Sequence, residues 1–158
     1  MTAPVTEAPA TPNTAITTDS LTYTLAVWSL GYHVRFGMIY TNTQSSPVQF
    51  SICPGLLPSF LQRWNGTAWE LAWQPSIAFS CSVTDITVAP GGTHQAVEDV
   101  SGASPATKFI PAWSRADPSG TYRAVWNIQR APGSADAAVP IPIEERVTNN
   151  FALRLPPE

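Results

Sequence analysis

Charged residues are scarce in this chain. They make up 12% of its 158 residues, comprise seven arginines and one lysine among the basic types, and leave a net charge of −3, whereas globular chains usually carry about 25% charged residues. Nucleic-acid ligands require clustered Lys and Arg to displace the counterions of phosphates, and anionic membrane surfaces attract similar clusters. No such cluster exists here, so we expect neither partner.

Long apolar runs and catalytic motifs are also missing. No stretch approaches the roughly 18 apolar residues of a transmembrane helix. The only histidines, His33 and His94, do not combine with the two cysteines in a zinc-binding spacing. Neither a Gly-x-Ser-x-Gly elbow nor a Gly-rich phosphate loop is present. We therefore expect no metal, no cofactor and no enzymatic activity.

The cysteines are few but even in number. Cys53 and Cys81 each lie beside a strand-like segment, and a bond between them would close a loop of about 29 residues, worth roughly 3.5 kcal/mol of denatured-state entropy. The alternative is two unpaired thiols, because sequence does not fix the distance between them. We predict the disulfide, and with it an oxidising, extracytoplasmic location such as the periplasm, the cell surface or the medium.

The N-terminus is rich in Ala, Pro and Thr. Residues 1–20 read "MTAPVTEAPATPNTAITTDS", a composition that buries too little apolar surface to offset its ordering entropy. We expect a disordered tether over residues 1–20 and one domain over residues 21–158. Two origins of the tether stay open: a natural flexible N-terminus, or a chain from which an export or lipoprotein leader has been removed.

A period of two dominates the rest of the chain. In "YHVRFGMIYTN", one strand face carries Tyr32, Val34, Phe36, Met38 and Tyr40. Gly37, in the middle of this run, indicates a bulge or a close backbone approach. "LTYTLAVW" alternates in the same way, with Leu21, Tyr23, Leu25 and Val27 on one face. Eight or nine such strands, separated by turn signals, predict an all-β antiparallel sandwich of the immunoglobulin-like kind.

The stretch "RWNGTAW" predicts a hairpin. Asn65-Gly66 is the preferred pair for a two-residue type I′ turn, which would make Trp64 and Trp69 diagonal neighbours. By parity, Trp69 and Trp73 share a strand face. Either this face packs on the core, or it is an exposed aromatic surface that binds a sugar or a protein. The candidate binding surface adds Trp113 and Arg115, from the Pro/Ser/Gly-rich loop 101–120, to Trp64, Trp69 and Trp73.

Histidine and carboxylate side chains meet in one motif. In "HQAVED", His94 and Glu98 share a strand face, and such a pair could support general base catalysis. Because no nucleophile motif accompanies the pair, we interpret it as a solvated strand face, and likewise His33 beside Arg35.

Several short patterns together resemble a known group. A strand running into "YTNTQSSPVQF" precedes Cys53, "RWNGTAW" precedes Cys81 and "VAPGGT", and "SGTYRAVW" precedes "RVTNNFAL". This outline, over residues 21–155, resembles bacterial immunoglobulin-like β-sandwich domains of exported proteins and lipoproteins. It is more weakly similar to the intracellular proteinase-inhibitor domains of bacilli. The resemblance implies a sandwich fold, and no reactive-site residue carries over.

Three functions follow from these observations. The first is a non-enzymatic, exported module for protein interaction or structural support at the cell envelope. It is either tethered through residues 1–20 or an accessory subunit of a larger assembly, and loops 101–120 and 130–142 are its expected contact regions. The second is a protease inhibitor of the bacillar type. The third is a carbohydrate-binding module that uses the tryptophans of the hairpin.

Overall fold

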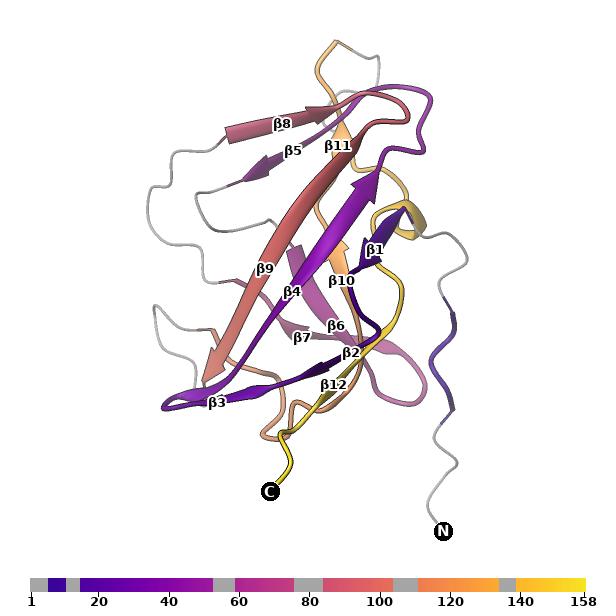
Figure 1. The fold of residues 1–158 in the computed structure, drawn as a ribbon. Coiled ribbons are helices and arrows are strands. Elements are labelled where there is room, and N and C mark those ends of the chain that lie inside the picture. The colour runs from indigo at the N-terminus through magenta and orange to yellow at the C-terminus, as the bar shows by residue number, and fades with distance from the viewer. Residues whose placement is uncertain (1–5, 11–14, 53–58, 76–83, 104–110, 134–138) are drawn as a thin grey trace.

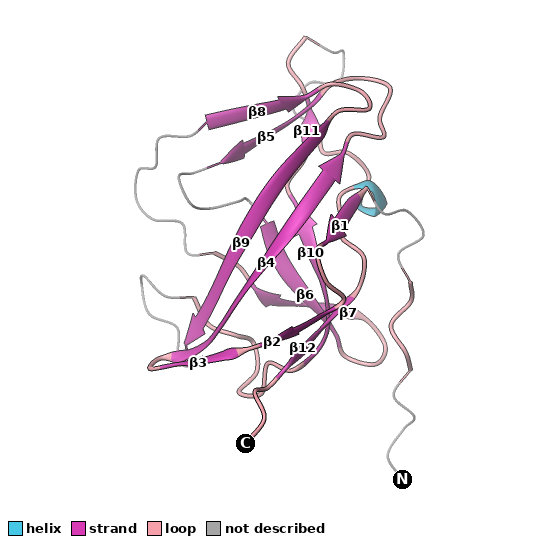
Figure 2. Cartoon of the chain, viewed as in Figure 1, coloured by secondary structure: helices cyan, strands magenta, loops and turns pink. Residues whose placement is uncertain are grey.

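The computed structural model describes residues 6–10, 15–52, 59–75, 84–103, 111–133 and 139–158. Their regular structure is almost entirely β, with one short 3-10 helix (Figure 2). The elements are β1 (Ile16–Thr18), β2 (Thr22–Thr24), β3 (Ala26–Trp28), β4 (Gly31–Thr41), β5 (Val48–Ile52), β6 (Ser59–Trp64), β7 (Trp69–Trp73), β8 (Thr84–Val88), β9 (Thr93–Ala103), β10 (Gly120–Trp126), β11 (Gln129–Arg130), η1 (Ile143–Glu145) and β12 (Phe151–Arg154).

The first sheet is built around β4. β9 pairs antiparallel with one edge of β4 along all eleven residues, while β1 and β3 share the other edge. The inward side chains of β4 are the ones that the alternation predicts: Val34, Phe36, Met38 and Tyr40 are all buried. Gly37 is not a bulge, since the β4–β9 register runs through it without a shift, and its carbonyl accepts from Asp19 N–H at 3.0 Å just beyond the end of β1.

The second sheet has the order β2-β12-β10-β6-β7, and a third, smaller one has the order β11-β5-β8. The ladders are antiparallel except that between β12 and β2. In Figure 1, β4 and β9 form the front layer, and β6 and β10 lie behind them. The shared core confirms that the layers are packed, because it contains side chains from all three sheets.

The centre of the core is aromatic. Tyr40 of β4, Phe50 of β5 and Trp126 of β10 have ring centroids 5.5–6.3 Å apart. The indole N–H of Trp126 lies 3.3 Å from the sulfur of Met38 on the opposite sheet. Each large apolar side chain buried in this way contributes about 1.5–3 kcal/mol. The all-β sandwich of mainly antiparallel sheets that the sequence predicts is confirmed by these packed sheets.

The N-terminal region differs from its prediction. Ile16 is fully buried and lies in β1, so the fold begins before the expected boundary at residue 21. The predicted strand over 21–28 is divided between two sheets: β2 pairs with β12, and β3 pairs with β4. Leu25, at the crossing, is buried, whereas Leu21 and Val27 are exposed. Such divisions give twelve strands in the described residues instead of eight or nine.

We predict that Gly102→Ala destabilises the fold by about 1–3 kcal/mol, because overpacking a dense site forces neighbours to shift. A Cβ at Gly102 would overlap the indole of Trp113, which is buried and donates its N–H to Tyr32 O at 3.1 Å. Equilibrium denaturation measures the loss.

Gly37→Ala is the matched control for this substitution. Its Cβ would meet only the end of the exposed Asp19 side chain, at 3.0 Å, and not a ring packed in the core. An equal loss for the two variants would contradict the packing assigned to Trp113.

Candidate functional site

The turn between β6 and β7 is longer than predicted. Asn65, Gly66, Thr67 and Ala68 form a four-residue loop, closed by the hydrogen bond from Asn65 N–H to Ala68 O at 3.0 Å. The side-chain oxygen of Asn65 accepts from both Thr67 N–H and Ala68 N–H at 2.8 Å. The prediction of a two-residue type I′ turn is therefore wrong. The Asn65 side chain stabilises a wider turn by accepting hydrogen bonds from backbone N–H groups two and three residues further along the chain.

This longer loop sets Trp64 directly opposite Trp69. The two residues are register partners, and their ring centroids lie 5.4 Å apart with the planes at 63°. They are direct neighbours, and not the diagonal ones that a shorter turn would give. An edge-to-face pair of this kind contributes about 0.5–1.5 kcal/mol beyond its buried area.

A β-bulge in β7 separates Trp69 from Trp73. Leu61 pairs with Trp73 and Gln62 pairs with Leu71, so Ala72 has no partner of its own in the ladder. One extra residue moves the following side chain to the other face of a sheet. Trp73 is consequently buried in the core, where its indole N–H donates to Ser101 O at 2.9 Å. The expectation that Trp69 and Trp73 share a face is wrong.

The outward side chains beside this bulge form a mixed aromatic and polar surface. We call it the tryptophan face, and its members share the solvent side of β6, β7 and β10. Register pairing joins Trp64 to Trp69, Gln62 to Leu71 and Gln62 to Arg123. Trp64 and Trp69 are half-buried, and Leu71 is 51% exposed. The tryptophan face consists of Gln62, Trp64, Trp69, Leu71 and Arg123.

Arg123 anchors the tryptophan face. Its guanidinium carbon lies 4.5 Å from the centroid of the Trp69 ring, within cation–π range. Its Nε–H donates to Gln62 Oε1 at 2.7 Å. Burial lowers the pKa of Arg123, but arginine remains protonated at neutral pH. The face thus presents a fixed cation stacked on an indole.

An N-terminal segment touches this face. The indole N–H of Trp64 donates to Thr6 O at 2.6 Å, and Asn150 Nδ2 donates to Pro9 O at 2.9 Å. In Figure 1 the indigo trace of this segment runs beside the β6–β7 loop. Residues 6–10 of the predicted tether therefore have defined contacts with the domain.

The two candidate residues from loop 101–120 lie in different environments. Trp113 is 6% exposed and belongs to the core, so it is not a surface residue. Arg115 is exposed and pairs with Glu70 on β7 at 3.5 Å. Hydrogen bonding from Asn65, and then from Arg115, lowers the pKa of Glu70. Arg115 is thus linked to the hairpin, beside the tryptophan face.

Glu98 and His94 do not form a solvated face. Glu98 on β9 is 2% exposed, and burial raises its pKa from 4.5 to about 8, against the lowering effect of Ser59. The ring of His94 packs on Phe50 at 5.1 Å, and burial lowers its pKa. His33, by contrast, lies on the solvent side, as the sequence predicts, and its ring also contacts Asp99 Oδ1 at 3.1 Å.

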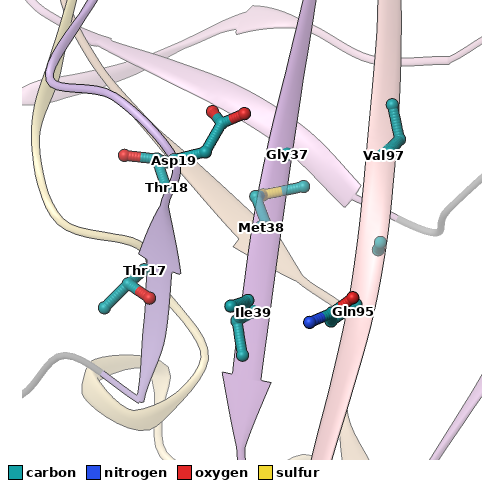
Figure 3. A pocket seen from close by; sticks show the side chains of 9 residues that line it. Thr17, Thr18, Asp19, Gly37, Met38, Ile39, Gln95 and Val97 are labelled. Carbon is teal, nitrogen blue, oxygen red and sulfur yellow. The ribbon is translucent and has the colours of Figure 1, made fainter.

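A pocket of about 490 Å³ lies on the opposite side of the sandwich, over Gly37 (Figure 3). Thr17, Ile39 and Gln95 form one row across β1, β4 and β9, and Val97 and Asp19 flank the glycine. Asp19 is its single carboxylate, and it accepts a hydrogen bond from Tyr23 Oη. Its lining offers the hydroxyls of Thr17 and Thr18. The Thr18 hydroxyl donates to Ser20 O and accepts from Asn149 Nδ2, so it is hydrogen-bonded to structural groups and not to a general base.

Other chemistry is limited as well. Within the described ranges, no three His, Cys, Asp or Glu side chains gather in a way that could hold a metal ion. No helix in that part of the chain is long and apolar enough to cross a membrane. The predicted disulfide remains a prediction, since Cys53 and Cys81 lie outside the described residues.

Comparison with known proteins adds little to this picture. No family model matches the chain, and no curated protein matches it by sequence. Among solved structures, it is similar to the ASH/PapD-like domain of human CEP192 (PapD-like domain 7) at 14% identity and a TM-score of 0.29. That match covers 98% of this chain and 91% of the other. At this TM-score we transfer no property from one protein to the other.

We predict that Asn65→Ala destabilises the fold by about 1 kcal/mol, because the turn loses the acceptor of two backbone N–H groups. Thermal or chemical unfolding measures the change. Because the Asn65 amide also donates to Glu70 Oε1, both variants are compared in a Glu70→Gln background. There Asn65→Asp keeps a side-chain oxygen at the same position without facing a carboxylate, and should lose less. An Asp variant as unstable as the Ala variant would contradict the role of that oxygen.

We predict that stability falls with pH between about 4.5 and 8 because of Glu98. Below this window both folded and unfolded states are protonated at Glu98. Within it the unfolded state has lost the proton that the folded state keeps, so the free energy of unfolding falls by about 1.4 kcal/mol per pH unit.

Glu98→Gln should remove this slope, since the amide stays neutral. Unfolding by denaturant at several pH values measures this: the free energy of unfolding of the variant should rise relative to that of the parent as the pH rises. His94 titrates in both proteins and cancels in the difference. Glu158→Gln, at the exposed end of the chain, is the control. Parallel curves for Glu98→Gln and the parent would contradict a protonated Glu98.

Proposed function

We propose that this protein is a non-enzymatic, immunoglobulin-like module that binds another protein through the tryptophan face. The observation that carries the proposal is the Trp64–Trp69 pair, with Arg123 stacked on it and Leu71 exposed beside it. Trp and Arg are enriched among the residues that dominate binding energy. Structural support at the cell envelope, as a subunit of an assembly, is the setting we propose for this binding.

The sheet itself supports this choice of surface. β7 is the end strand of the order β2-β12-β10-β6-β7, so the face continues to a sheet edge. A residue such as Leu71, which is 51% exposed and lies two residues along β7 from Trp69, loses water on contact with a partner. Asn65 and the Ala72 bulge hold the hairpin in shape, so little order has to be created on binding.

Sugar binding is less well supported. Stacking on a sugar ring favours flat, open aromatic surfaces, whereas the planes of Trp64 and Trp69 are inclined at 63°. Arg123 also lies over the Trp69 ring. Trp73, the third candidate, is in the core. No contact or loop geometry in the described residues favours a protease inhibitor.

An extracytoplasmic location is part of the proposal. Its support is the pair Cys53 and Cys81 in a chain with few charged residues. A partner in the cell envelope agrees with that location. The absence of catalytic motifs in the sequence supports a binding role over an enzymatic one.

We predict that Leu71→Glu lowers partner capture at least tenfold while the melting temperature stays within a few degrees. Leu71 is exposed, so the change leaves the core intact but places a charge in a surface that must lose water. Quantitative pull-down from an extract of the cells that make the protein measures the effect.

Val27→Glu is the matched control, because Val27 is 73% exposed on β3, in the other sheet. It should capture the same partner as the parent protein does. Equal capture by Leu71→Glu and Val27→Glu would overturn the proposed use of the tryptophan face.

A further inference from the structure

Residues 6–10 contact the domain through backbone carbonyls at a regular spacing. The two carbonyls that accept hydrogen bonds, Thr6 O and Pro9 O, are three residues apart. Three residues complete one turn of a polyproline II helix, which leaves its backbone carbonyls free to accept hydrogen bonds. Thus one side of an extended segment faces two donors of the domain.

The donors come from two strands that are not adjacent. Trp64 ends β6, and Asn150 directly precedes β12, with β10 between them. Register pairing sets Phe151 beside Tyr122, and Tyr122 beside Arg63, so the donors lie two strands apart and about one pleat out of line. The separation across the two strands, two spacings of about 4.8 Å, is close to the roughly 9 Å rise of three polyproline II residues. The side chains of Trp64 and Asn150 span the remaining offset along the strands, since both reach the segment.

The domain contacts the backbone of the segment more than its side chains. Thr6, Glu7, Pro9 and Ala10 are exposed, and only Ala8 is half-buried. An indole N–H and an amide of Asn can serve any extended segment whose carbonyls have this spacing. Proline favours such a segment, because its fixed φ reduces the order lost on binding and it has no N–H to leave unpaired.

We propose that Trp64 and Asn150 form a site for extended, proline-containing peptide segments, and that residues 6–10 occupy this site in cis. The site adjoins the tryptophan face, so it rests on the function proposed above and names the class of its partner. Tethering gives the segment a high local concentration, although its contacts are few. A partner peptide must displace it, and the N-terminal segment thereby regulates access to Trp64.

The test uses the full-length chain. In one variant, the five substitutions Thr6→Gly, Glu7→Ser, Ala8→Gly, Pro9→Ser and Ala10→Gly weaken the segment without shortening the protein. The probe is a synthetic, fluorescently labelled peptide of residues 4–12, PVTEAPATP, blocked at both ends. Fluorescence anisotropy measures its dissociation constant for the parent and the variant.

We expect the substituted protein to bind the probe at least tenfold more tightly than the parent, since its site is free. Adding Trp64→Phe to that variant keeps an aromatic ring but removes the donor, and should weaken binding about tenfold. Trp28→Phe, on exposed β3, is the control and should change nothing. In the probe, glycine in place of Pro9 should weaken binding, whereas alanine in place of Glu7 should not.

Equal binding by the parent and the substituted protein would overturn the occupation in cis. Unchanged binding in Trp64→Phe, or no binding to any variant, would overturn the site. These failures are distinct from failure of the proposed function, which is decided by Leu71-dependent capture of a protein. Capture that persists in a protein unable to bind the probe would leave the tryptophan face as an interface for a folded partner.

Discussion

The bulge at Ala72 is the constraint on which the rest of the candidate site depends. Without the bulge, Trp69 and Trp73 would lie on the same face of β7. Either the core would then lose the indole of Trp73, or the surface would lose the indole of Trp69. The extra residue sends Trp73 inward, where it donates to Ser101 O of β9 and thus ties the edge strands of the two sheets together. It leaves Trp69 outward, opposite Trp64 and beneath Arg123.

The other end of the site is held by the Asn149-Asn150 pair. Asn149 Nδ2 donates to Thr18 Oγ1 at 2.8 Å and its Oδ1 accepts from Thr18 N–H at 2.9 Å, which fixes β1 beside the start of β12. Asn150 donates to Pro9 O. The N-terminal chain therefore first contacts the outer surface of the β10 sheet and later enters the β4 sheet. A segment of such composition is well suited to lie on a surface, because it requires no ladder partner.

Much of the fold could be predicted because alternation is a local signal. The strand from Gly31 to Thr41 shows it clearly, and its buried side chains are the expected ones. The bulge had no such signal: "WELAW" alternates without Gly or Pro, and only the partner strand reveals the shift. The four-residue turn depends on one side-chain oxygen of Asn65. The burial of Glu98 depends on the sheet that packs against β9. Neither feature follows from the spacing of residues along the chain.

The most direct test of this account is the solvent accessibility of individual indoles. Protein labelled with 5-fluorotryptophan, with resonances assigned by single Trp→Phe variants, can be titrated with a soluble paramagnetic gadolinium chelate. We predict strong broadening for Trp69, weaker broadening for Trp64, and none for Trp73, which is 3% exposed. Equal broadening of Trp69 and Trp73 would show that they share a face, and would contradict the bulge and the tryptophan face together.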